Sequence, residues 1–302
     1  MRVLIVVNPF ATSVTARNRV VVTKALRDGN DVSLVETNRR GHASRLAADA
    51  AARGVDVVVA FGGDGTLNEV ANGLAGTETA LAPLPGGSTN VFARTIGLPN
   101  DPVPAVHILA GALRRQSMKR VGLGMLNGRY FLFHTGVGFD AAVVERVEQR
   151  GQLKRWAGHP LFIYAGLTTW VRYRRDPPRF RAAFPDGEAL DDRVFAVVLN
   201  TNPYTYLGNT PLDLSPAATL ERGLVLVTFT SLKAPLLLRS VVSALRGLGL
   251  PSVSGVDERS DLNRVLLTAA RPVPYQVDGD FLGELNRFDF RHEPDAIDLV
   301  IP

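Results

Sequence analysis

The chain has no cysteine, which excludes disulfide bonds, thiolate metal sites and thiol catalysis. It also has no run of about 18 apolar residues, the length that a membrane-spanning helix needs. Arg239 and Arg246 interrupt the longest candidate, Pro235–Leu250. The opening apolar run, Val3–Val7, is too short for a signal peptide. We therefore expect a cytoplasmic globular protein.

The 302 residues suffice for two domains, since one domain typically has about 150 residues. The formal net charge of +5 is modest but unevenly distributed. Cationic residues gather in one segment: Arg146, Arg150, Lys154, Arg155, Arg172, Arg174, Arg175, Arg179 and Arg181. This segment could meet anionic lipid or nucleic acid, although a solvated charged face is the simplest interpretation.

Strands and helices alternate in the first part of the chain. Strands are expected at Arg2–Val7 and Asp31–Glu36, and helices at Thr15–Asp28 and His42–Arg53. This βαβ rhythm predicts a parallel sheet that binds ligands at the carboxyl ends of its strands. The residues at these ends are Asn8, Thr37, Gly62 and Gly86.

A first glycine-rich loop follows the β-branched strand Val55–Phe61. Its residues are Gly62, Gly63, Asp64, Gly65 and Thr66. Glycines let several backbone N–H groups converge on one anion, and a helix expected from Leu67 adds its positive end. Asp64 could hold the metal ion that accompanies a nucleotide phosphate. Taken alone, the loop could equally be a tight turn with Thr66 as helix N-cap.

A second glycine-rich loop, Pro85–Asn90, repeats this design after a strand at Ala80–Pro83. Two such loops in successive βα units favour a nucleotide-phosphate site over simple turns.

The sequences of these two loops, GGDGTLNEVANGL (Gly62–Leu74) and PGGSTNVFAR (Pro85–Arg94), resemble one known family. They are similar to the diacylglycerol kinases and sphingosine kinases, in the bacterial soluble branch of these lipid kinases. Weaker similarity extends over nearly the whole chain.

The resemblance implies ATP and Mg²⁺ as cofactors and assigns the nucleotide site. The residues implied for nucleotide binding are Asn8, Thr37, Gly62, Gly63, Asp64, Gly65, Thr66, Asn68, Gly86, Gly87, Ser88 and Thr89. In the family, the loop after the first strand usually reads asparagine, proline, any residue, serine and glycine. Asn8 and Pro9 match this pattern, but Ala11 and Thr12 stand where serine and glycine are usual.

After a polar stretch, Arg114–Arg120, the pattern changes to many short strands. A hairpin is expected from Val121–Leu126 and Tyr130–Thr135. Further strands are expected at Arg179–Phe184, Phe195–Thr201, Val225–Phe229, Val265–Ala269, Tyr275–Val277 and Phe288–Phe290, and a helix at Pro235–Leu245. The mostly apolar segment Leu153–Arg174, with Pro160 in its first turns, is either a core helix or part of a lipid or bilayer surface.

These patterns predict a Rossmann-like parallel α/β domain followed by a β-sandwich domain. The first domain would comprise residues 1–120, joined by the C-terminal segment 291–302. Residues 121–290 would form the lipid-substrate domain. The apolar run Ile297–Ile301 is expected to return to the first domain as a strand.

The candidate general base lies in the stretch Gln276–Asp280. Read alone, Asp278-Gly279 after an apolar run is a hairpin turn. The resemblance implies that Asp278 is the catalytic proton acceptor, with Asp64 as the second catalytic carboxylate. Asp280 stands where the family has glutamate, and Asp64 and Asp280 are the metal-binding candidates.

Two departures from the family pattern concern acidic residues. Arg222 and Gly122 occupy positions where aspartates of the metal network are usual. An arginine cannot ligate a cation, so we expect the second magnesium site of the family to be absent.

The expected function is an ATP-dependent lipid kinase that phosphorylates a primary hydroxyl, with diacylglycerol as the first choice of acceptor. A sphingoid base or another lipid alcohol, an NAD kinase activity, and a non-catalytic nucleotide- or lipid-binding protein remain alternatives. The expected partner is a lipid substrate at the membrane surface, with peripheral contact at the inner face of the membrane and a homodimer left open. No nucleic-acid-binding module is recognisable.

Overall fold

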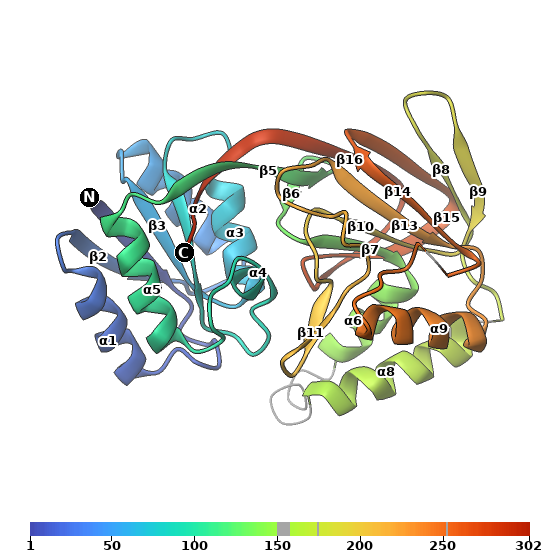
Figure 1. Ribbon diagram of the computed structural model, residues 1–302, viewed down its shortest axis with the longest axis horizontal. Coiled ribbons are helices and arrows are strands. Elements are labelled where there is room, and N and C mark those ends of the chain that lie inside the picture. The colour runs from blue at the N-terminus through green and yellow to red at the C-terminus, as the bar shows by residue number, and fades with distance from the viewer. Residues whose placement is uncertain (150–157, 174, 252) are drawn as a thin grey trace. The chain divides into compact units, whose positions relative to one another are not determined.

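The computed structural model describes residues 1–149, 158–173, 175–251 and 253–302 (Figure 1). The chain divides into two compact units. The first contains Met1–Leu123 and Pro294–Pro302, and the second contains Gly124–Glu293.

The first unit alternates strands and helices, as the sequence predicts. The elements are β1 (Arg2–Val7), α1 (Ala16–Leu26), β2 (Asp31–Glu36), α2 (His42–Ala52), β3 (Val57–Gly62), α3 (Asp64–Leu74), β4 (Ala80–Pro85), α4 (Val91–Thr95) and α5 (Pro102–Arg114). The four strands pair in parallel in the order β2, β1, β3, β4. Figure 1 shows α1 with α5, and α2 with α3, as the helices that cover this sheet.

The central strands are apolar on both faces because helices cover both sides of the sheet. Every residue of β3 and β4 is buried. At the carboxyl ends of the strands, the Asn8 N–H donates to the carbonyl of Phe61, and the Thr37 N–H donates to that of Val7. The loops that follow β1, β2 and β3 therefore leave the sheet at one common edge.

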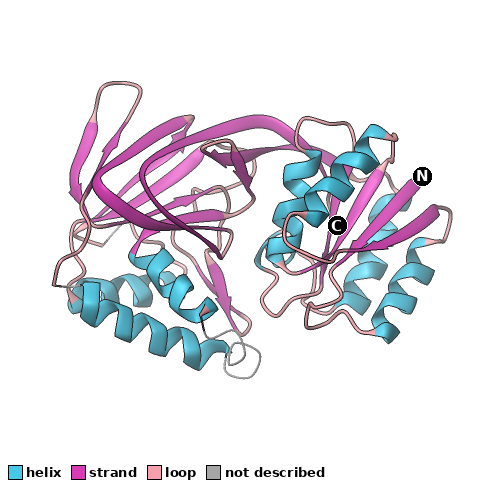
Figure 2. Ribbon diagram, turned by 180° about the vertical axis from the view of Figure 1, so that it is seen from behind, coloured by secondary structure: helices cyan, strands magenta, loops and turns pink. Residues whose placement is uncertain are grey.

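The second unit is rich in strands. It contains β5 (Met118–Leu126, which begins in the first unit), β6 (Arg129–Phe131), β7 (His134–Gly138), β8 (Phe180–Ala183), β9 (Ala189–Arg193), β10 (Phe195–Leu199), β11 (Thr205–Leu207), β12 (Thr210–Leu212), β13 (Leu224–Phe229), β14 (Val256–Leu262), β15 (Arg264–Val277) and β16 (Asp280–Val300). Its helices are α6 (Phe139–Glu148), α8 (Gly158–Tyr173) and α9 (Ala234–Leu245). Figure 2 shows these helices gathered beside the strands of the unit.

The main sheet of this unit has the order β14, β13, β10, β7, β15, β16. Its two faces carry separate apolar cores: Ala196 and Val198 of β10 face one core, whereas Val197 and Leu199 face the other. β16 then continues into the first unit, where Leu299 pairs in parallel with Leu81 of β4. This is the returning strand that the run Ile297–Ile301 predicts. The fold class is confirmed: a parallel α/β part precedes a β-rich part.

Two strand predictions were wrong in detail. The run Tyr130–Thr135 is not one strand, because β6 pairs with β5 whereas β7 pairs with β10 and β15. Conversely, the two predicted strands Val265–Ala269 and Tyr275–Val277 belong to one strand, β15. Its register shifts between Thr268 and Val273. The shift accommodates Pro272, which has no N–H to donate.

The segment Leu153–Arg174 is only partly covered by the structure. Arg150, Lys154, Arg155, Trp156 and Arg174 lie outside the described residues. The helix expected there is α8, with Pro160 in its first turn, where a missing N–H has no cost.

Candidate active site

The first glycine-rich loop is the junction between β3 and α3. The helix begins at Asp64 with Gly63 as its N-cap, so the prediction that it starts at Leu67 was wrong. Residues Asp64–Thr66 therefore form the first helical turn, and their N–H groups belong to the set that finds no acceptor inside a helix. Such N–H groups form an anion-binding site. The Thr66 side chain folds back over Gly62, where a Cβ would come within 2.7 Å of the Thr66 Oγ1.

The second glycine-rich loop packs directly on the first. The Gly86 N–H donates to the Gly62 carbonyl over 2.8 Å. A Cβ atom on Gly86 would lie 2.9 Å from the Gly62 Cα, and one on Gly87 would lie 2.8 Å from the Gly63 Cα. The two loops that the sequence predicts to be neighbours thus touch, backbone against backbone.

Asp64 ties the first loop to the helix that follows the second. Its Oδ2 accepts the Val91 N–H over 3.0 Å, and its Oδ1 accepts the Phe92 N–H over 3.2 Å. Both donors lie at the start of α4, where a negative charge is favourable. Asp64 therefore holds the two loops in register, a contact that the sequence did not indicate.

Asn90 is a residue whose role sequence reasoning missed. It is buried in the left-handed region at φ 48°, which asparagine tolerates better than most residues. Its Oδ1 accepts the Gly87 N–H, and its Nδ2 donates to the Gly87 carbonyl and to the Asn100 Oδ1. Asn100 in turn donates to the Ser88 carbonyl. The signal was present in the sequence, because Asn90 closes the PGGSTN motif.

The other predicted nucleotide-binding residues surround these loops with different degrees of exposure. Asn8 donates through Nδ2 to the Thr66 Oγ1 over 3.1 Å, which joins the loop after β1 to the first turn of α3. Ser88 is exposed and Thr89 half-buried, whereas Thr37 is buried. Asn68 is only 1% exposed and accepts from the Asn72 Nδ2 one turn later, so the structure does not bring it to the loop surface.

Asp278 lies in the second unit, in the two-residue turn between β15 and β16. Asp278 and Gly279 both have positive φ, at 48° and 81°, and Val277 pairs with Asp280 across the turn. The carboxylate is only 3% exposed and accepts three N–H groups, from Leu132 (2.8 Å), Phe133 (3.0 Å) and His134 (3.2 Å). These bonds explain why the predicted strand Tyr130–Thr135 is divided here. The structure therefore buries the predicted base inside a ring of backbone donors.

A buried polar cluster lies beside this turn and was also missed. Asp140 accepts from the Tyr204 hydroxyl and, over 2.7 Å, from the Gln276 Nε2. The Gln276 Oε1 accepts the Gly279 N–H, which connects the cluster to the Asp278 turn. Gly136 has no space for a Cβ, which would overlap the Asp140 Oδ2. The close approach of Asp140 thus explains why a glycine is needed at position 136, shortly before α6.

Burial shifts the pKa values of the ionisable groups in this cluster. Desolvation raises the pKa of Asp140, and hydrogen bonds from Tyr204 and Gln276 oppose this effect. Burial next to the Asp140 carboxylate raises the pKa of Tyr204 well above its usual value. Burial lowers the pKa of His134 to about 3. The His134 ring is 4.2 Å from that of Tyr204, centroid to centroid, so it packs in the cluster as a neutral aromatic group.

The two metal-binding candidates, Asp64 and Asp280, belong to different units. Asp280 is the first residue of β16. Among the described residues, no group of three or more His, Asp or Glu side chains could hold a metal ion.

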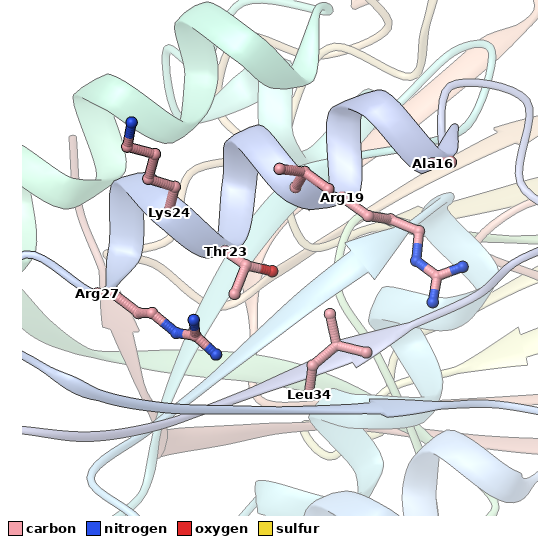
Figure 3. Close-up of a pocket in the computed structure, with 7 residues that line it drawn as sticks. Ala16, Arg19, Thr23, Lys24, Arg27 and Leu34 are labelled. Atoms are coloured by element: carbon pink, nitrogen blue, oxygen red, sulfur yellow. The ribbon is translucent and has the colours of Figure 1, made fainter.

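Two hollows open on the first unit. One, of about 620 Å³, lies between α1 and β2, with aliphatic groups of Val20 and Leu34 and the cations Arg19, Lys24 and Arg27 around it (Figure 3). None of these residues was predicted to bind a ligand. The other, of about 700 Å³, borders the second glycine-rich loop. Its lining residues Ser13 and Asn100 hydrogen-bond the Gly86 and Ser88 carbonyls, respectively.

Comparison with known proteins assigns the chain to a family. Residues 2–121 match the diacylglycerol kinase catalytic domain. The chain is 30% identical over 286 residues to a Pseudomonas aeruginosa protein named "Probable lipid kinase YegS-like", covering 94% of this chain and 89% of that protein. The chain belongs to the bacterial lipid kinase family that includes diacylglycerol kinases. It is accordingly a kinase that transfers a phosphoryl group to an alcohol acceptor.

A further relative and a solved structure are also similar to this chain. The diacylglycerol kinase of Bacillus subtilis is 27% identical over 272 residues, which cover 88% of this chain and 84% of that enzyme. A crystal structure of a diacylglycerol kinase from Bacillus anthracis superposes with a TM-score of 0.71 at 19% identity, over 100% of this chain and 97% of that one. The structural likeness bears on the fold. In the part of this chain that the structure describes, no helix is long and apolar enough to span a bilayer.

Proposed function

We propose that this lipid kinase transfers the γ-phosphate of ATP to the primary hydroxyl of diacylglycerol, giving phosphatidic acid. The contact between the two glycine-rich loops carries the proposal. Their backbones meet with no side chain between them, at the carboxyl edge of a parallel sheet and at a helix start. Helix N-termini with converging backbone N–H groups favour phosphate groups.

In this proposal the first unit binds the nucleotide and the second unit binds the lipid. Gly62, Gly63, Gly65 and Thr66 would surround the phosphates, with Gly86, Gly87, Ser88 and Thr89 completing the pocket. Asn8 supports this arrangement through its bond to Thr66. Thr37 and Asn68 are buried, so their contribution would be to hold the loops in shape.

Mg²⁺ enters the proposal as the ion carried by the nucleotide. This metal is typically bound by one or two carboxylates together with substrate phosphates, so it needs no cage of protein ligands. Asp64 is the carboxylate at the glycine-rich loops and is the residue proposed to hold it. The ion would neutralise charge on the transferred phosphoryl group.

Asp278 is proposed as the proton acceptor for the lipid hydroxyl. Three backbone N–H groups stabilise its ionised form, which is the form that a general base requires. Because the carboxylate is buried, the acceptor hydroxyl can reach it only when the Asp278–Gly279 turn opens. The proposal therefore includes movement of this turn during the catalytic cycle.

The deciding experiment is transfer of labelled γ-phosphate from ATP to a mixed lipid extract, with intact protein and with Asp278→Asn. We expect labelled phosphatidic acid from the intact protein and a loss of about 100-fold or more in the variant. Circular dichroism would check that both proteins are folded. Label in a sphingoid base, or in NAD offered in a parallel assay, would identify that molecule instead of diacylglycerol as the acceptor. No labelled product from folded protein would overturn the proposal.

The acceptor also determines where the enzyme works. A diacylglycerol molecule resides in a bilayer, so the proposed enzyme acts as a cytoplasmic protein at the inner face of the membrane. The oligomeric state, including a homodimer, enters no step of the proposal.

A further inference from the structure

Helix α9 of the second unit presents its apolar side chains outward. Leu238 is 66% exposed, Val241, Val242 and Leu245 are also exposed, and Leu248 in the following turn is 63% exposed. The four helical residues follow the spacing i, i+3, i+4 and i+7, which places them on one face of the helix. This face is contiguous and aliphatic.

The opposite face of α9 is partly polar, although it is the buried one. Leu236 and Ala244 join the core formed by β10 and β13, but Ser240 and Ser243 are buried beside them. Each serine hydroxyl donates to a backbone carbonyl, Ser240 to Leu236 and Ser243 to Gly249. A surface helix normally faces the core with its larger apolar residues. In α9 Leu238, Val241, Val242 and Leu245 face outward instead, which indicates that something other than water covers them.

The charges that α9 and its flanking residues carry have one sign. Residues 222–256 include no aspartate or glutamate. Lys233, Arg239 and Arg246 are exposed and form no ion pair with another described residue. The carboxylate of Asp213, at the carboxyl end of α9, is engaged by the Asn202 Nδ2. Helix α8 runs alongside α9 in both views, and the Trp170 Nε1 donates to the Leu232 carbonyl just before α9 (Figures 1 and 2).

We propose that the outward face of α9 binds the surface of an anionic bilayer. An apolar helix face flanked by Lys and Arg is the pattern of a helix that lies in the membrane interface. The leucines and valines would enter the acyl boundary, and Arg239 and Arg246 would pair with lipid phosphates. Charge complementarity selects a bilayer over a second copy of the chain, because the same cationic rim would repel itself across a two-fold contact. The inference rests on the proposed function only in that a lipid acceptor must be reached.

The test is binding of full-length protein to vesicles, measured by co-sedimentation without ATP. Vesicles of phosphatidylcholine with phosphatidylglycerol are compared with vesicles of phosphatidylcholine alone. We expect binding to the anionic vesicles that weakens with added salt. Leu238→Gln with Leu245→Gln should reduce it by about tenfold per residue. Arg239→Gln with Arg246→Gln should reduce it by about fivefold per charge.

Val20→Gln is the matched control, because Val20 is 69% exposed on α1 of the first unit. It should bind vesicles as the unaltered protein does. Equal binding by the α9 variants and the unaltered protein overturns the proposal. So does a change from dimer to monomer in the leucine variant, measured by light scattering, without a change in vesicle binding. Kinase activity on a short-chain acceptor dispersed in detergent should be unchanged in the α9 variants, which separates this inference from the proposed function.

Discussion

Gly86 lies directly against Gly62, with its N–H bonded to the Gly62 carbonyl and no space between the two Cα positions for a methyl group. The contact joins two loops that are 24 residues apart in the chain. Because backbone meets backbone, any side chain at Gly86 must push the loops apart. The separation of the two loops is therefore set by the absence of a Cβ.

Gly86→Ala is expected to disrupt the nucleotide site. The new Cβ would lie 2.9 Å from both the Gly62 Cα and the Val14 Cγ2, so the loops must shift. A displacement of this size costs on the order of 100-fold in catalytic efficiency, and overpacking lowers the free energy of unfolding by about 1–3 kcal/mol. Steady-state kinetics with varied ATP and thermal unfolding measure the two effects.

Gly166→Ala in α8 is the control for this substitution. A Cβ at Gly166 meets nothing within 4 Å, and alanine favours a helix. This variant should be as stable as the unaltered protein or more stable, with unchanged KM for ATP. If Gly86→Ala behaves in the same way, the close packing of the loops has no functional importance.

Asp64 can be tested for two separable roles. Asp64→Ala removes the acceptor for the Val91 and Phe92 N–H groups and should lower the free energy of unfolding by about 1–2 kcal/mol. Asp64→Asn keeps one acceptor oxygen and should recover part of this loss. Both variants should lose about 100-fold in kcat, because asparagine cannot replace the carboxylate charge at the phosphates.

The dependence of rate on Mg²⁺ concentration completes this test. For Asp64→Asn we expect the Mg²⁺ concentration at half-maximal rate to rise. An asparagine variant with nearly normal kcat would show that Asp64 acts only as the link between the first loop and α4.

Several parts of this fold follow from local sequence pattern. The strands β1 and β3 are dense in β-branched residues, and the loops after β3 and β4 carry their glycines in recognisable motifs. Local pattern does not reveal bonds between distant residues. The Asp64 carboxylate bonds the start of α4, 27 residues later in the chain. Asp278 bonds the N–H of Leu132, 146 residues earlier. Both contacts depend on tertiary packing.

The errors in the sequence-based elements have the same origin. Tyr130–Thr135 has the composition of one strand, yet the N–H groups of Leu132 and Phe133 are taken by Asp278 rather than by a neighbouring strand. The spacing of the apolar residues in α9 indicates that they share one face of the helix. It does not indicate whether that face is buried or exposed. Its serines face the sheet because β10 and β13 lie there.

Asp278→Asn should reduce stability as well as activity. The carboxylate accepts three N–H groups in a nearly water-free position, and an asparagine NH₂ turned toward one of these donors would accept nothing. A buried donor left unpaired costs about 1–3 kcal/mol. Urea unfolding should show this loss with an unchanged m-value. An activity loss without any stability loss would indicate that the carboxylate leaves these donors readily, as the opened turn requires.

His134 is expected to make the protein sensitive to acid. Burial lowers its pKa to about 3 in the folded state, from 6.5 when exposed. Between these values the unfolded chain binds a proton that the folded protein does not, so stability falls as the pH is lowered. This loss is about 1.4 kcal/mol per pH unit between pH 6.5 and the folded-state pKa of about 3, and it is absent above pH 6.5.

His134→Phe isolates this effect because phenylalanine keeps a ring against Tyr204 and does not titrate. Asp140 acts in the opposite direction, since its raised pKa makes the folded state bind a proton more readily than the unfolded chain as the pH falls. Asp140 is present in both proteins, so the difference between their urea unfolding curves from pH 7 to pH 4 cancels its contribution to first order. We expect the variant to lose less stability on acidification. Parallel curves would mean that His134 takes up its proton in the folded protein as readily as in the unfolded chain, which would contradict the lowered pKa.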